Sequence, residues 1–142
     1  MLMSSKQKYE NTSKMNSSRD MSPIRVLIAD DHPLHRKMLS LWFSEEGIVV
    51  AGEARDGEEV LHNIEEDEFD VILLDITLPK KDGITVLNEL RKLGKKIPVI
   101  IVSNYPKEDY ESAILSMGAS SYVEKGNLKQ IIETIKALVA TR

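Results

Sequence analysis

The sequence predicts an α/β protein with a doubly wound, five-stranded parallel sheet and five helices on its two faces. Five short apolar runs alternate with five longer stretches in which apolar residues recur at helical spacing. The runs are almost continuously apolar, which is typical of strands buried on both faces of a parallel sheet. Strict alternation of strand and helix favours right-handed crossovers, and 142 residues suffice for one such domain.

The first strand is expected at Ile24–Ala29, directly before the acidic pair Asp30-Asp31. Pro33 suits the first turn of the helix that follows, and Gly47 is typical of the residue just after a helix end. Four large apolar residues recur on one face of this helix: Leu34, Met38, Leu41 and Trp42. We expect this face to lie in the core or at its rim.

The second strand is expected at residues 48–51 and the third at residues 71–74, directly before Asp75. Asp56-Gly57 precedes the helix between them. The apolar face of that helix comprises Val60, Leu61 and Ile64.

After Asp75, a loop with Pro79 and Gly83 leads to a helix whose apolar face comprises Leu87, Leu90 and, at its far end, Leu93. The fourth strand is expected at residues 99–102, before Ser103, and the fifth at residues 121–123, close to Lys125. The helix between these two strands carries Ala113, Ile114 and Met117, and ends near Gly118. The last helix has a strong apolar stripe, formed by Leu128, Ile131, Ile132, Ile135, Leu138 and Val139.

Residues 1–22 differ from the rest of the chain. They are rich in Ser, Lys, Asn and Met without apolar periodicity, so we interpret them as a disordered arm or an added leader, and residues 23–142 as the domain. Residues 1–23 carry four basic and two acidic residues, a net charge of +2, so the remaining residues carry −6 of the total of −4. Such an acidic body argues against nucleic-acid binding by this segment itself.

The composition excludes several classes of protein. The chain has no cysteine, which excludes disulfides, cysteine metal sites and thiol catalysis. No apolar run approaches the roughly 20 residues that span a bilayer, and the N-terminus has no signal-peptide core. These observations predict a protein of the reducing cytoplasm that does not bind membranes.

Polar side chains stand where four of the five strands end: Asp30-Asp31, Asp75, Ser103 and Lys125. In an open parallel sheet these ends meet at one edge, where ligands bind. Three clustered carboxylates repel each other unless some are protonated or a cation lies among them, and Mg²⁺ suits such oxygen ligands. A carboxylate can attack phosphorus, while a lysine and a hydroxyl can stabilise the transferring phosphoryl oxygens. The edge therefore has the groups needed to form an acyl phosphate.

Each of these residues also has an ordinary structural interpretation. An Asp after a strand is often only the N-cap of the next helix. Ser103 alone fits a turn or a cap, and Lys125 alone fits a solvated surface position. Their joint occurrence at the ends of different strands favours the functional interpretation.

Four segments in order resemble a known family, the receiver domains of two-component response regulators. The resemblance runs from Ile24 to about Thr141. The spacings fit as well, with 44 residues from Asp31 to Asp75 and 50 from Asp75 to Lys125. The segments are residues 26–33 (VLIADDHP), 70–83 (DVILLDITLPKKDG), 98–103 (PVIIVS) and 118–125 (GASSYVEK).

The resemblance implies a flavodoxin-like receiver fold and a role for each site residue. Asp75 would be the phosphoacceptor, and Lys125 would pair with the phosphoryl group. Asp31, Asp75 and the backbone carbonyl of Thr77 would ligate Mg²⁺, with Asp30 acting through a metal-bound water. Ser103 would move toward the phosphoryl group and Tyr122 would swing inward behind it, a two-state change biased by one local event. Such a switch also catalyses its own phosphorylation and dephosphorylation, so its standing as an enzyme is left open.

The Asp-Asp-His-Pro segment at residues 30–33 is most similar to the subfamily with LuxR-type helix-turn-helix output domains. The implied partner is a sensor histidine kinase, and DNA would be bound only through an output domain that this chain does not contain. The chain is then either a fragment of a transcription regulator or a stand-alone receiver, and a homodimer is a further open alternative.

Some residues depart from the common pattern or invite other roles. Asn104 and Tyr105 follow Ser103 and would border the phosphoryl pocket, which leaves the phosphoryl lifetime open. His32 is expected at a helix start rather than on a metal, and His35 and His62 are expected on the surface.

Three other functions fit the sequence less well. A haloacid-dehalogenase-like phosphatase would have an Asp two residues after its nucleophile, where this chain has Thr77. A docking module without phosphorylation would not require all the site positions to be filled. A flavodoxin-like cofactor binder would have a phosphate-cradling loop after the first strand, where this chain is acidic.

Overall fold

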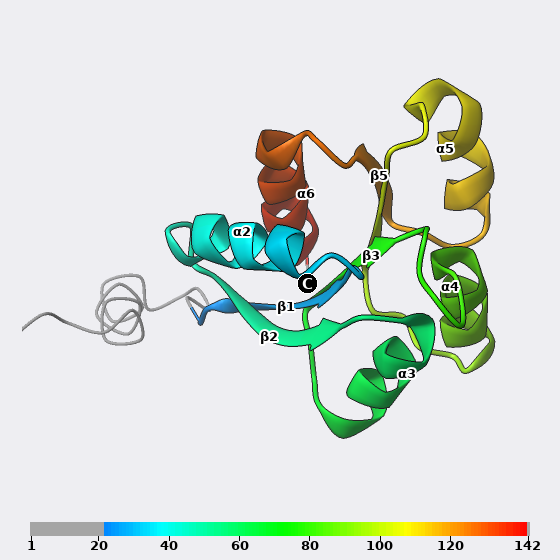
Figure 1. Ribbon diagram of the computed structural model, residues 1–142, viewed down its shortest axis with the longest axis horizontal. Helices are drawn as coiled ribbons and strands as arrows, with labels where there is room; N and C mark the ends of the chain where they lie inside the picture. The colour runs from blue at the N-terminus through cyan, green and yellow to red at the C-terminus, as the bar shows by residue number, and fades with distance from the viewer. Residues whose placement is uncertain (1–21, 142) are drawn as a thin grey trace, which may run out of the picture.

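The computed structural model describes residues 22–141, which fold into five strands and five helices in strict alternation (Figure 1). The strands are β1 (Ile24–Ala29), β2 (Ile48–Ala54), β3 (Val71–Asp75), β4 (Val99–Ser103) and β5 (Ser121–Glu124). The helices are α2 (Pro33–Ser44), α3 (Gly57–Glu66), α4 (Gly83–Lys92), α5 (Lys107–Ser116) and α6 (Leu128–Ala140). The predicted arm lies outside the described residues except for Ser22.

All five strands pair in parallel in the order β2-β1-β3-β4-β5. The order places β1, β3, β4 and β5 side by side, so the polar residues that follow these four strands come to one edge. β2 is the edge strand beyond β1, and it runs three residues further than the sequence predicted, through Ala54. Its pairing with β1 shifts register between Val26 and Leu27, which leaves Ala51 out of the register. The predicted α/β class and doubly wound sheet are confirmed.

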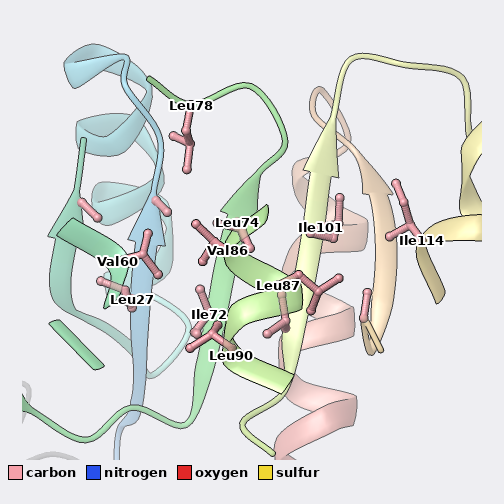
Figure 2. Packing of buried hydrophobic residues seen from close by; sticks show 14 of the residues in the cluster. Leu27, Val60, Ile72, Leu74, Leu78, Val86, Leu87, Leu90, Ile101 and Ile114 are labelled. Atoms are coloured by element: carbon pink, nitrogen blue, oxygen red, sulfur yellow. The ribbon is translucent and has the colours of Figure 1, made fainter. Parts of the chain in front are cut away.

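The core lies on both faces of the sheet because successive strand residues point to opposite faces. Leu27, Ile72 and Ile101 pack with α3, α4 and α5 on one face, where Figure 2 shows Val60, Val86, Leu87 and Leu90 against the strands. Val26, Leu73 and Ile100 face the other side, toward α2 and α6. These two layers explain why the strands are apolar almost throughout.

The orientation of α2 differs from the prediction. The side chains that α2 buries are Leu39 and Phe43, which pack with β1, β3 and α6. The predicted core face is exposed instead: Leu34 at 70%, Met38 at 49%, Leu41 at 63% and Trp42 at 55%. The helix has apolar residues on two faces, and the pattern alone did not identify which of them meets the sheet.

The remaining predicted elements are confirmed with small changes at their ends. Leu87 and Leu90 are buried in α4, and Ile114 is buried in α5. The expected apolar faces end earlier than the sequence predicted, because Leu93 and Met117, directly after these two helices, are exposed. Among residues 22–141, no helix is both long and apolar enough to cross a membrane.

Candidate functional site

The site lies where neighbouring strands end. Asp30 follows β1, Asp75 and Ser103 are the last residues of β3 and β4, and Lys125 follows β5. Asp30, Asp75 and Ser103 are buried, at 3%, 6% and 2% exposure. Buried carboxylates are unfavourable without partners, so their contacts define what the site can do.

Asp75 is held by two hydrogen bonds. The Thr77 amide donates to its Oδ1 at 3.0 Å, and the Lys125 ammonium donates to its Oδ2 at 2.7 Å. Burial disfavours the charged ammonium of Lys125, but its hydrogen bond to Asp75 and the charges of Asp75 and Asp30 outweigh burial and raise its pKa. Lys125 is therefore a fixed positive charge beside Asp75.

Asp30 is surrounded by donors. The His32 amide donates to its Oδ1 at 2.8 Å, and its Oδ2 contacts His35 Nδ1 and lies 3.4 Å from the Lys125 ammonium. Burial acts to raise the pKa of Asp30, but the hydrogen bonds from His35 and His32 and the charge of Lys125 lower it below its ordinary value. Asp30 is thus a stable anion.

Asp31 completes an acidic cluster. Its Oδ1 is buried and accepts no hydrogen bond from the described residues, although His32 Nδ1 lies 3.0 Å away. One ligand atom from each of Asp30, Asp31, His32 and Asp75 lies within 4.8 Å of the others. An unsatisfied carboxylate oxygen among further carboxylates fits a hard divalent cation such as Mg²⁺.

The loop after Asp75 packs tightly against two helix starts. The Gly83 amide donates to the Ile76 carbonyl at 2.8 Å, and the Gly57 amide donates to the Pro79 carbonyl at 3.3 Å. A Cβ on Gly83 would overlap the Asp75 backbone, and a Cβ on Gly57 would overlap the Lys81 carbonyl. Glycine at both positions therefore allows the loop that carries Thr77 to lie close against α3 and α4.

Ser103 and Tyr122 are joined through Tyr105. The Tyr105 amide donates to Ser103 Oγ at 3.0 Å, and the Tyr122 hydroxyl donates to the Tyr105 carbonyl at 2.8 Å. Tyr122 is 1% exposed, so its ring already lies inside the protein. Tyr105 is itself exposed and packs against Tyr110 with ring centroids 5.1 Å apart, and Asn104 is exposed as well.

Two residues of the site were missed by the sequence analysis. His35 was expected on the surface, but it contacts Asp30, and its side chain is 25% exposed. Arg36 donates from Nη1 to the Asp30 carbonyl at 2.6 Å and from Nε to Glu53 at 2.9 Å. The available signal was helical spacing, because His35 lies one turn before Leu39 and two turns before Phe43, the two side chains that α2 buries. The other expectation, an exposed His62, agrees with the structure.

A family model for the response regulator receiver domain matches residues 26–136, which cover the site and all of the sheet except the first two residues of β1. The chain belongs to this family. The receiver resembles the transcription regulator BvgA of Bordetella pertussis, with 34% identity over 117 residues, 82% of this chain and 56% of BvgA.

Solved structures of response regulators have the same fold as this chain. A LuxR-family two-component response regulator from Aurantimonas is 27% identical with a TM-score of 0.78, and the match covers 85% of this chain and 88% of that one. TrrA of Thermotoga maritima, solved with Mg²⁺ and BeF, is 33% identical with a TM-score of 0.71. The match covers 81% of this chain and 98% of the TrrA chain. The receiver spans about half the length of BvgA.

Proposed function

We propose that this receiver takes a phosphoryl group on Asp75 from a sensor histidine kinase in a phosphorelay of the cytoplasm. The observation that carries the proposal is the arrangement around Asp75, a buried carboxylate 2.7 Å from the Lys125 ammonium and beside an acidic cluster. Neither a helix cap nor a surface charge requires this arrangement.

In the proposed reaction, a carboxylate oxygen of Asp75 forms the new P–O bond. The P–N bond of the phosphohistidine breaks, and its electron pair stays on the kinase imidazole. Lys125 balances the charge on the phosphoryl oxygens, and the Ser103 hydroxyl donates to one of them. Asp31, Asp75 and the Thr77 carbonyl would hold Mg²⁺, with Asp30 reaching it through water. The bound cation would supply further charge neutralisation.

The proposed switch uses the connection between Ser103, Tyr105 and Tyr122. Ser103 Oγ accepts from the Tyr105 amide, so a shift of Ser103 toward a phosphoryl group would pull on the loop at Tyr105. The Tyr105 carbonyl accepts from Tyr122, which would pass the shift to β5. A local charge change would thus bias the surface formed by the start of α5 and β5.

The output is proposed to be transcription regulation through a DNA-binding domain in the full-length protein, as the names of the relatives suggest. The receiver itself has an acidic body, which disfavours direct DNA contact. The second candidate is a stand-alone or non-phosphorylated receiver that acts as a docking module. Homodimer formation stays an open alternative.

The first test is intact mass after incubation with acetyl phosphate and Mg²⁺. We expect the receiver to gain one phosphoryl group, because the acidic cluster and Lys125 surround Asp75. Asp75→Asn is expected to gain none, and removal of Mg²⁺ by a chelator should abolish the gain. A folded wild-type receiver that gains no mass, or an Asp75→Asn variant that gains as much as the wild type, would favour the docking module.

The kinase is proposed to dock on the exposed apolar face of α2, formed by Leu34, Met38, Leu41 and Trp42. α2 begins at Pro33, two residues after Asp31, so a kinase helix packed along this face would reach the edge of the sheet beside Asp75. Scattered apolar side chains are normal on protein surfaces, but four on one face of a helix are typical of an interface.

Leu41→Ser is expected to slow phosphotransfer from a sensor kinase that phosphorylates the wild type by about 5- to 30-fold, because an apolar anchor is lost. Leu93→Ser is the matched control, since Leu93 is equally exposed, at 66% against 63% for Leu41, but follows α4. Both variants should react with acetyl phosphate at the wild-type rate. An equal loss in both variants with the kinase would contradict docking on α2.

A further inference from the structure

His35 is the third residue of α2 and contacts Asp30 from the side of the helix that carries the buried Leu39 and Phe43. Its Nδ1 meets Asp30 Oδ2, and its side chain is 25% exposed, which makes it the more buried of the two histidines at the site. His32, by comparison, is 67% exposed at its side chain. His35 is thus a fixed part of the site wall, although none of the roles proposed above uses it.

The two oxygens of Asp30 have different partners. Oδ1 accepts from the His32 amide, whereas Oδ2 is shared by His35 Nδ1 and the Lys125 ammonium. The same ammonium is closer to Asp75, at 2.7 Å against 3.4 Å from Asp30. Lys125 therefore lies between two buried carboxylates and shares one of them, Asp30, with His35.

We propose that His35 is a positioning residue that occupies Asp30 Oδ2 and thereby directs the Lys125 ammonium to Asp75. This inference rests on the proposed phosphorylation of Asp75. Without His35, Lys125 is the one remaining side-chain donor among the described contacts of Oδ2, and the ammonium moves toward Asp30 to satisfy it. The charge that should meet the incoming phosphoryl group is then misplaced.

The interaction needs a hydrogen-bond donor at Nδ1 and no more than that. An ionised carboxylate only accepts hydrogen bonds, so the proton belongs on the Nδ1 of His35, and the neutral tautomer is sufficient. An asparagine amide nitrogen lies at nearly the same place relative to the backbone. His35→Asn should therefore keep the contact, whereas His35→Phe and His35→Leu remove the donor and keep an apolar side chain.

The test measures the rate of phosphorylation by acetyl phosphate over a series of Mg²⁺ concentrations. His35→Phe is expected to lower the rate at saturating Mg²⁺ by about 10- to 100-fold, the usual effect of losing a supporting hydrogen bond at such a site. The Mg²⁺ concentration for half-maximal rate should change little, and His35→Asn should restore most of the rate. His62→Phe on the exposed side of α3 is the control and should match the wild type.

Two further variants separate positioning from folding. His35→Leu replaces His35→Phe if circular dichroism shows that the Phe variant does not fold. If His35 acts through Asp30, then His35→Phe added to Asp30→Asn should slow the reaction no further than Asp30→Asn alone. A crystal structure of the folded variant should place the Lys125 ammonium nearer to Asp30 than to Asp75.

The outcomes distinguish this inference from the proposed function. A wild-type rate in His35→Phe, a rate in His35→Asn as low as in His35→Phe, or additive losses with Asp30→Asn would overturn the positioning role and leave phosphorylation of Asp75 intact. A wild-type receiver that reacts no faster than Asp75→Asn would instead overturn the proposed function.

Discussion

Replacing Phe43 with alanine is expected to lower the free energy of unfolding by about 3–5 kcal/mol. Phe43 is fully buried where α2 packs on β1 and β3 beside α6, and the truncation leaves a cavity that the surrounding strands cannot fill. Chemical denaturation followed by circular dichroism measures the loss.

Trp42→Ala is the matched control, because Trp42 is the adjacent aromatic residue of the same helix and is 55% exposed. We expect this change to stay within about 0.5 kcal/mol of the wild type, as is usual for surface positions. The comparison tests the orientation of α2 directly. If Trp42→Ala were the costlier change, α2 would face the sheet as the sequence pattern predicted.

Replacing Lys125 with methionine is expected to slow phosphorylation of Asp75 by acetyl phosphate by about 100- to 1,000-fold, the cost of losing one oriented charge at a buried reaction centre. Methionine has a similar length but no ammonium, so the 2.7 Å contact with Asp75 is lost. The phosphorylation rate at saturating Mg²⁺, read by intact mass, gives the effect.

Lys129→Met provides the control, because the Lys129 side chain is 87% exposed on α6 and its ammonium pairs with Glu133. It should react at the wild-type rate. If a folded Lys125→Met variant reacts as fast as the Lys129→Met variant, Lys125 takes no part in the proposed reaction.

The fold followed from the sequence because a buried parallel strand and an amphipathic helix leave different periodicities. The apolar runs at β1, β3 and β4 were recognised to within one residue, and the polar residues at their ends indicated the site edge. Asp30, Asp75 and Lys125 come together in the structure as parallel pairing requires. The roles assigned to these residues stay predictions.

The orientation of α2 did not follow from the sequence. Leu34, Met38, Leu41 and Trp42 form a larger apolar stripe than Leu39 and Phe43, so hydrophobicity alone favoured the wrong face. The contact of His35 with Asp30 was missed for the same reason, since it depends on which side of α2 meets the sheet. Helical spacing finds stripes, but tertiary packing decides between two stripes on one helix.

The two glycine contacts of the loop after β3 limit how its length can change. Gly83 fixes one end against Ile76, and Gly57 fixes the middle at Pro79. The exposed Thr77 side chain between these anchors can vary at little cost. Asp82 is more restricted, because its side chain caps α4 by accepting from the Thr85 amide at 2.8 Å. An inserted or deleted residue, however, would break one anchor or move Thr77 relative to Asp75. Homologous chains that keep this site should therefore differ here by substitution, with insertions confined to loops such as the one after α4.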